Sequence, residues 1–192
     1  MADLDLIPII QGAKMIFPYL LTFFRFVIGF VFVTSLIGKA GDIPAFTQAI
    51  TNFRFFPQSF SKPLAYLFLL GEFGTVVAML FGRELLFWGF LVAMLMFLSF
   101  SIALSSVILR KIETTCNCFG PDQKDVNFGH VLRSLGFMIC GIGGSIISYL
   151  HNIPSGSIEI INLIFVGAFS AVFVLVWMHI GDILQFFEPL RS

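Results

Sequence analysis

The chain has 192 residues, and its 11 cations balance its 11 anions. Hydrophobic residues make up 58% of it and charged residues only 11%, where soluble proteins carry about a quarter. This composition excludes an ordinary soluble domain, the lack of a basic block argues against nucleic-acid binding, and the apolar runs predict an integral membrane protein. The length predicts a single domain over 1–192. The acidic amino terminus is unlike a signal peptide, so we expect the first span to direct its own insertion.

Five apolar stretches approach the length of about 20 residues that a helix needs to cross the hydrocarbon layer. The expected spans are about 18–37, 63–81, 85–109, 127–149 and 158–180. Gly38 and Lys39 are expected to close the first span, and Asn127 to cap the start of the fourth. The sequence therefore predicts an all-α polytopic membrane bundle.

The segment 43–56 has a different pattern. Phe46, Ala49 and Phe53 recur at helical spacing, with polar side chains between them. This pattern predicts a short amphipathic helix in the membrane interface, ended by Pro57. A partly ordered loop is the alternative.

Three charged residues lie well inside the expected spans: Arg25, Glu72 and Arg133. A charge at membrane depth costs at least ~2.5 kcal/mol unless it is paired or hydrated. Helical rise places Glu72 about 13 Å and Arg133 about 8 Å below the same membrane face. We therefore expect an Arg133–Glu72 pair, with Arg25 as a competitor. The pair has either a purely structural role or a ligand or proton role.

The loop between the third and fourth expected spans, 110–126, contains Cys116 and Cys118. A disulfide between residues i and i+2 closes a strained ring, and strain makes a disulfide easily reduced. The nearby cations Arg110, Lys111 and Lys124 favour a reactive thiolate. The spacing therefore favours thiol–disulfide exchange at Cys116 and Cys118. A loop staple, two inert thiols, or a zinc site that also uses His130 and Asp122 or Asp125 are the alternatives, and the zinc spacing matches poorly.

The third cysteine, Cys140, lies about 18 Å away by helical rise and is expected to pack as a small apolar residue. It shares a face with Gly136 and Gly144, and such small-residue faces let helices approach closely. His130 and His179 are expected at span boundaries.

Several of these residues form a recognisable series: Arg25, Gly29, Phe32, Ser35 and Lys39, then Glu72, then Cys116, Cys118, Phe119 and Gly120, then Arg133. With this series the chain resembles the MauE family of methylamine-utilisation proteins, within the wider DoxX-like group of membrane proteins. The resemblance covers about 18–150, and the Cys-x-Cys-Phe-Gly element is its most specific part. It implies a DoxX-like four-helix core, to which the span at 158–180 is an addition.

The resemblance also implies a function. MauE-type proteins are redox-associated proteins of the bacterial cytoplasmic membrane that support disulfide formation in an exported partner. In methylamine metabolism that partner is the small subunit of methylamine dehydrogenase, assisted by a thioredoxin-like protein. A quinone or another membrane acceptor is expected to remove the electrons, and no metal is expected. The rival functions are a non-enzymatic subunit or chaperone of a membrane complex, and a small-solute or metal carrier.

The distribution of cations disagrees with this role. Outside the expected spans, seven cations share the face of the cysteine loop: Lys39, Arg54, Lys62, Arg110, Lys111, Lys124 and Arg191. Lys14 and Arg83 lie on the opposite face. The positive-inside rule therefore places the cysteines in the cytoplasm, whereas the resemblance implies an outward-facing pair. We favour the outward orientation, because the same cations can serve the thiolates.

Overall fold

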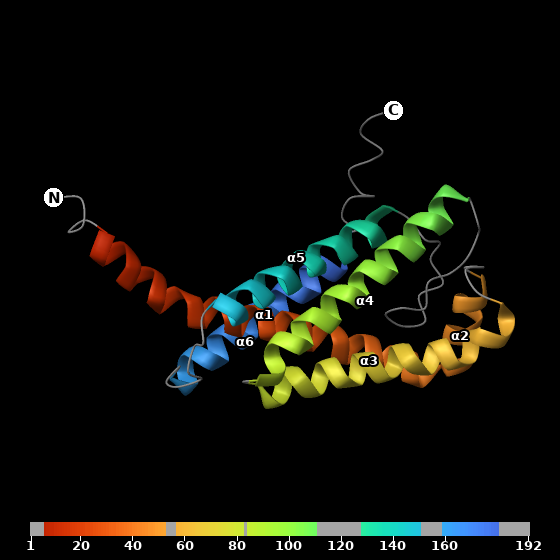
Figure 1. Ribbon diagram of the computed structural model, residues 1–192, viewed down its shortest axis with the longest axis horizontal. Coiled ribbons are helices and arrows are strands. Elements are labelled where there is room, and N and C mark those ends of the chain that lie inside the picture. Colours follow the sequence, from red (N-terminus) through yellow and green to blue (C-terminus); the bar gives the residue numbers. More distant parts are fainter. Residues whose placement is uncertain (1–5, 53–56, 83, 111–127, 151–158, 181–192) are drawn as a thin grey trace.

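The computed structural model describes residues 6–52, 57–82, 84–110, 128–150 and 159–180 (Figure 1). Within these ranges the regular elements are helices. They are α1 (Leu6–Gly41), α2 (Ile43–Asn52), a short 3-10 helix (Gln58–Phe60), α3 (Ser61–Phe81), α4 (Glu84–Leu109), α5 (Phe128–Leu150) and α6 (Ile160–Met178).

Five of these helices are long and apolar enough to cross a membrane: α1, α3, α4, α5 and α6. A helix satisfies its backbone hydrogen bonds internally, which hydrocarbon requires because it offers no partners. The predicted all-α polytopic bundle is confirmed. The predicted third span, 85–109, differs from α4 by one residue at its start.

Four helices form the core of the bundle. α1 packs on α3 and α5, α3 packs on α4, and α4 packs on α5, so the four close into a ring. Their inner faces bury a largely apolar cluster that includes Val27, Phe32, Phe90, Phe97 and Phe137. Their outer faces expose large apolar side chains, as expected for helices surrounded by lipid.

α6 packs on the outside of this ring, mainly against α1 (Figure 1). It buries Ser170 and Val174, while most of its other side chains are exposed or half-buried. The predicted arrangement of a four-helix core with a fifth span is therefore confirmed.

The predicted end of the first span is wrong. Gly38 and Lys39 do not close α1, which continues to Gly41. Lys39 is buried, with 1% of its surface exposed, instead of lying at the membrane surface. The helix continues past it because its charge is neutralised inside the bundle, as described below.

The amphipathic helix is confirmed as α2, over Ile43–Asn52. Its apolar side chains Phe46 and Ala49 are buried, and it lies where α1 ends and α3 begins (Figure 1). The remainder of the predicted helix, 53–56, lies outside the described residues, and so does the predicted cap Asn127.

The small residues of α5 permit close packing, as predicted. A side chain at Gly144 would overlap the ring of Phe90 on α4, and one at Gly136 would overlap the indole of Trp177 on α6. Cys140 lies between them, buried in the main core cluster. The expectation that Cys140 is a packing residue is therefore confirmed.

Candidate functional site

All four core helices contribute to a small cavity inside the bundle. The volume in which the centre of a water molecule could lie is about 30 Å³. The lining residues are Val31, Phe32, Ser35 and Lys39 from α1, Glu72 from α3, Phe97, Phe100 and Leu104 from α4, and His130, Arg133, Ser134 and Phe137 from α5. Since Leu104 is near the end of α4 and His130 near the start of α5, the cavity lies toward the end of the bundle that connects to the cysteine segment.

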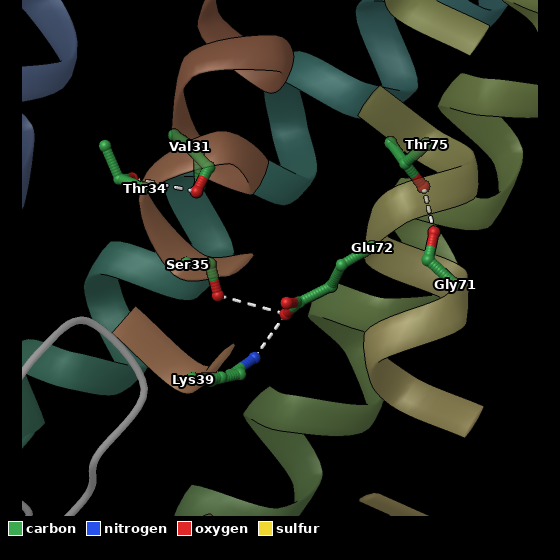
Figure 2. A network of polar contacts seen from close by, with 7 residues as sticks. All are labelled: Val31, Thr34, Ser35, Lys39, Gly71, Glu72 and Thr75. Atoms are coloured by element: carbon green, nitrogen blue, oxygen red, sulfur yellow. Dashed lines mark hydrogen bonds and ion pairs between the residues drawn. The ribbon is translucent and has the colours of Figure 1, made fainter. Parts of the chain in front are cut away.

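The carboxylate of Glu72 is the central polar group of this site. Its Oε1 accepts a hydrogen bond from Ser35 Oγ at 3.0 Å and an ion-paired hydrogen bond from Lys39 Nζ (Figure 2). Ser35 and Lys39 are four residues apart on α1, so they lie on the same face of the helix, toward α3. All three side chains are buried.

Aromatic rings surround the ammonium group of Lys39. Its Nζ lies 4.3 Å from the ring centroid of Phe100 on α4 and 4.9 Å from that of Phe46 on α2. A cation over a ring face is attracted by the ring quadrupole, and the attraction is stronger away from water. Phe46 is itself buried, so α2 helps to shield the ion pair from solvent.

The predicted Arg133–Glu72 pair is wrong. Both side chains line the cavity, but the ion-pair partner of Glu72 is Lys39. Arg133 instead donates from Nη1 to the carbonyl of Met178 on α6, at 3.3 Å. Because α1 continues through Lys39, the lysine reaches Glu72 from the neighbouring helix, on the face that already carries Ser35.

Arg25 is not part of this site. Its guanidinium donates to the carbonyls of Met79 and Leu80, at the end of α3. The last carbonyls of a helix lack partners within the helix and carry partial negative charge, so a cation there caps the helix. The chain then turns at Gly82, which has a positive φ of 65° and packs against the same guanidinium. The prediction that Arg25 competes for Glu72 is therefore also wrong.

The α5 wall of the cavity contains a second polar contact. Ser134 Oγ donates to the carbonyl of Phe97 at 3.1 Å and accepts from Ser101 Oγ at 3.0 Å. These bonds join α4 to α5 beside the cavity. His130, expected only at a span boundary, lines the cavity as well.

The predicted thiol site lies outside the described residues, since Cys116, Cys118, Phe119 and Gly120 fall within 111–127. The described residues that flank this segment are Arg110, directly after α4, and Phe128, at the start of α5. The segment is therefore attached at the end of the bundle toward which the cavity lies.

Sequence reasoning did not place Ser35, Ser134 or Phe46 beside Glu72 or in this cavity. A signal existed for Ser35, because a Ser-x-x-x-Lys spacing puts both side chains on one helix face. The role of Phe46 had no such signal, since it depends on how α2 folds against α1 and α4.

Comparison with known families places the chain. The family model described as Methylamine utilisation protein MauE matches residues 17–147. This range includes α3 and α4, most of α1 and α5, every residue that lines the cavity, and the cysteine segment. No curated protein and no solved structure matches the chain.

Proposed function

Because the chain belongs to the MauE family of methylamine-utilisation proteins, we propose that it carries out thiol–disulfide exchange at Cys116 and Cys118. Membership and the five spans make it a multi-pass membrane protein associated with methylamine utilisation. The proposed role is to support disulfide formation in an exported partner from the bacterial cytoplasmic membrane. A thioredoxin-like protein and the small subunit of methylamine dehydrogenase are the proposed partners.

One observation carries the proposal. The segment with Cys116 and Cys118 joins α4 to α5 at the end of the bundle where Lys39, His130 and Arg133 line a cavity. Basic side chains near a thiol favour the thiolate, which is the species that exchanges disulfides. The four-helix core thus carries basic side chains at the end of the bundle to which the cysteine segment is connected.

The proposed reaction has two steps. A partner dithiol first exchanges with the Cys116–Cys118 disulfide, which leaves the partner with a disulfide and this protein with two thiols. A quinone or another acceptor in the membrane would then take two electrons and two protons from the two thiols, which forms the disulfide again. The intermediate of the first step is a mixed disulfide, which we assign to Cys116 because Arg110 and Lys111 are closer to it in sequence.

Trapping this intermediate tests the function. In Cys118→Ser, the thiolate of Cys116 attacks the disulfide of an oxidised partner, which is the reverse of the first step. Cys118 is then absent and cannot resolve the mixed disulfide by forming the Cys116–Cys118 bond. We expect a covalent complex that appears as a higher-mass band on non-reducing gels and disappears on reduction. Cys116→Ser is expected to trap nothing.

Cys140→Ser is the matched control, because Cys140 is buried among core side chains. It should leave both results unchanged. If neither Cys116→Ser nor Cys118→Ser traps a partner and both support normal disulfide formation in the cell, the pair is not catalytic. A titration of the pair in redox buffers then identifies a structural staple, which would stay oxidised in strong reductant.

A further inference from the structure

One carboxylate oxygen of Glu72 has no hydrogen-bond donor among the residues that the structure describes. Oε1 accepts from Ser35 and Lys39, whereas Oε2 is buried and has no donor among the described residues. A buried carboxylate oxygen without a donor is destabilising, because in water it would be hydrogen-bonded. A donor other than the described side chains is therefore expected at Oε2.

The cavity beside Glu72 has space for such a donor. About 10–15 Å³ open to its centre is enough for one water molecule, and this cavity offers about 30 Å³. The other walls contain polar partners as well. The hydroxyl oxygen of Ser134 accepts one hydrogen bond, from Ser101, and an oxygen of this type has two lone pairs. One lone pair of Ser134 is therefore available on the α5 side.

The charges around the cavity favour a neutral ligand. Lys39 already neutralises Glu72, so the pair adds no net charge to the cavity. An added cation would lie close to the ammonium of Lys39, and an anion would meet the carboxylate oxygen Oε2 of Glu72. A small neutral molecule that both donates and accepts hydrogen bonds satisfies Oε2 without a charge conflict, and water is the smallest such molecule.

We propose that the cavity is a water-binding site, in which one or two internal waters donate to Glu72 Oε2 and join α3 to the polar side chains of α5. The site is independent of the cysteine pair, so its test does not depend on the proposed redox function. The bound water holds the carboxylate in the orientation in which Oε1 meets Ser35 and Lys39. It also extends the polar site of Glu72 across the bundle, toward the α5 helix that carries His130 and Arg133.

A cavity-filling substitution distinguishes a hydrated cavity from a dry one. Val31 is buried and lines the cavity, and Val31→Ile adds one methylene group. In a dry cavity the added group fills empty space and raises the apparent Tm. In a hydrated cavity it displaces the water and leaves Oε2 without a donor. We expect Val31→Ile to lower the apparent Tm by about 2–4 °C.

The same substitution in a background without the ion pair tests the link to Glu72. In Lys39→Met/Glu72→Met no carboxylate needs the water, so Val31→Ile is expected to leave the Tm unchanged or raise it. Val27→Ile is the matched control, because Val27 is a fully buried valine one turn earlier on α1 that does not line the cavity. It measures the cost of adding a methylene to a closely packed part of the same helix.

A rise in Tm for Val31→Ile in both backgrounds means a dry cavity and overturns the proposal. So does a fall that Val27→Ile reproduces and that persists without the ion pair, because that fall reports only overpacking. A high-resolution experimental map of the unmodified protein decides the matter if a variant does not fold. Density within hydrogen-bond distance of Oε2 is expected, and its absence overturns the proposal.

Discussion

At the scale of single residues, the buried charge of Glu72 is stabilised by contacts from three other helices. Ser35 and Lys39 come from α1, and the rings that cover the lysine come from α2 and α4. Removing an ion pair from water costs desolvation free energy that can cancel its Coulombic attraction. The additional hydrogen bond and ring contacts therefore help to stabilise the buried pair. Three helices besides α3 thus help to stabilise one buried carboxylate, either directly or through Lys39.

This arrangement predicts a strong asymmetry between single and double substitutions. Lys39→Met leaves a buried carboxylate with Ser35 as its remaining protein donor, and it should reduce the free energy of unfolding by about 3–5 kcal/mol. Glu72→Gln should also be destabilising, because it leaves the lysine charge buried without an anion. Lys39→Met/Glu72→Met should recover most of the loss, because apolar side chains of similar volume replace both charges. Thermal unfolding in one detergent measures all three.

Lys62→Met is the control, since Lys62 is exposed at the start of α3 and its loss should have little effect. The assignment of the ion pair fails if the double variant is as unstable as the sum of the single variants. That result would mean that Lys39 and Glu72 are each stabilised by other groups.

At the scale of helices, the glycines of α5 determine how closely side chains of the neighbouring helices approach it. Gly136 faces the indole of Trp177, whose Nε1 donates to the carbonyl of Arg133 at 3.2 Å. Arg133 in turn donates to the carbonyl of Met178. These two bonds attach α6 to α5 near the cavity. Apart from them, α6 packs mainly on α1.

Gly136→Ala should therefore displace Trp177 and weaken the attachment of α6. The new methyl would overlap the indole ring, so the side chain must move and its hydrogen bond to Arg133 should break. Tryptophan fluorescence in a Trp88→Phe background, in which Trp177 is the remaining tryptophan, should show a shifted emission maximum. The Tm should fall by about 2–4 °C for each kcal/mol lost.

Gly74→Ala is the matched control for the same chemical change. Gly74 lies inside α3, and an added methyl there would have no neighbour within 4 Å. Alanine is favoured over glycine in a helix by about 1 kcal/mol, so this variant should be neutral or stabilising. Equal Tm losses at Gly74 and Gly136 would show that the indole contact has no special role.

The helices were predictable from sequence because membrane insertion depends on local apolar length, as α4 illustrates. The partners of the buried charged side chains could not be predicted from the sequence. Helical rise gives the depth of Arg133 and Glu72 but not the direction in which each side chain points around its helix axis. The role of Arg25 depends on α3 ending beside it, at Phe81, which is a property of packing. Lys39 was predicted as a motif residue but not as the partner of Glu72, because a lysine after a glycine resembles a helix end. Its pairing with Glu72 accounts for the continuation of α1 past it.

At the scale of the whole molecule, the two ends of the bundle carry different groups. Lys39, Leu104 and His130 line one cavity, so the end of α1, the end of α4 and the start of α5 lie toward the same end of the bundle. Arg25 and the α3–α4 turn lie at the other. Burial of Lys39 removes it from the seven cations assigned to the cysteine face, so six remain against Lys14 and Arg83.

The orientation of the molecule is decided by which end faces the outside of the cell. An exported partner can reach Cys116 and Cys118 only if the cysteine end is outside, and we predict this orientation although six cations against two favour the opposite one. A membrane-impermeant maleimide applied to intact, reduced cells should therefore label both thiols. Cys140 should stay unlabelled, because it is buried in the core, and a Cys116→Ser/Cys118→Ser variant measures that background. Labelling only after permeabilisation would place the pair in the cytoplasm, in agreement with the cation count, and would rule out direct exchange with an exported protein.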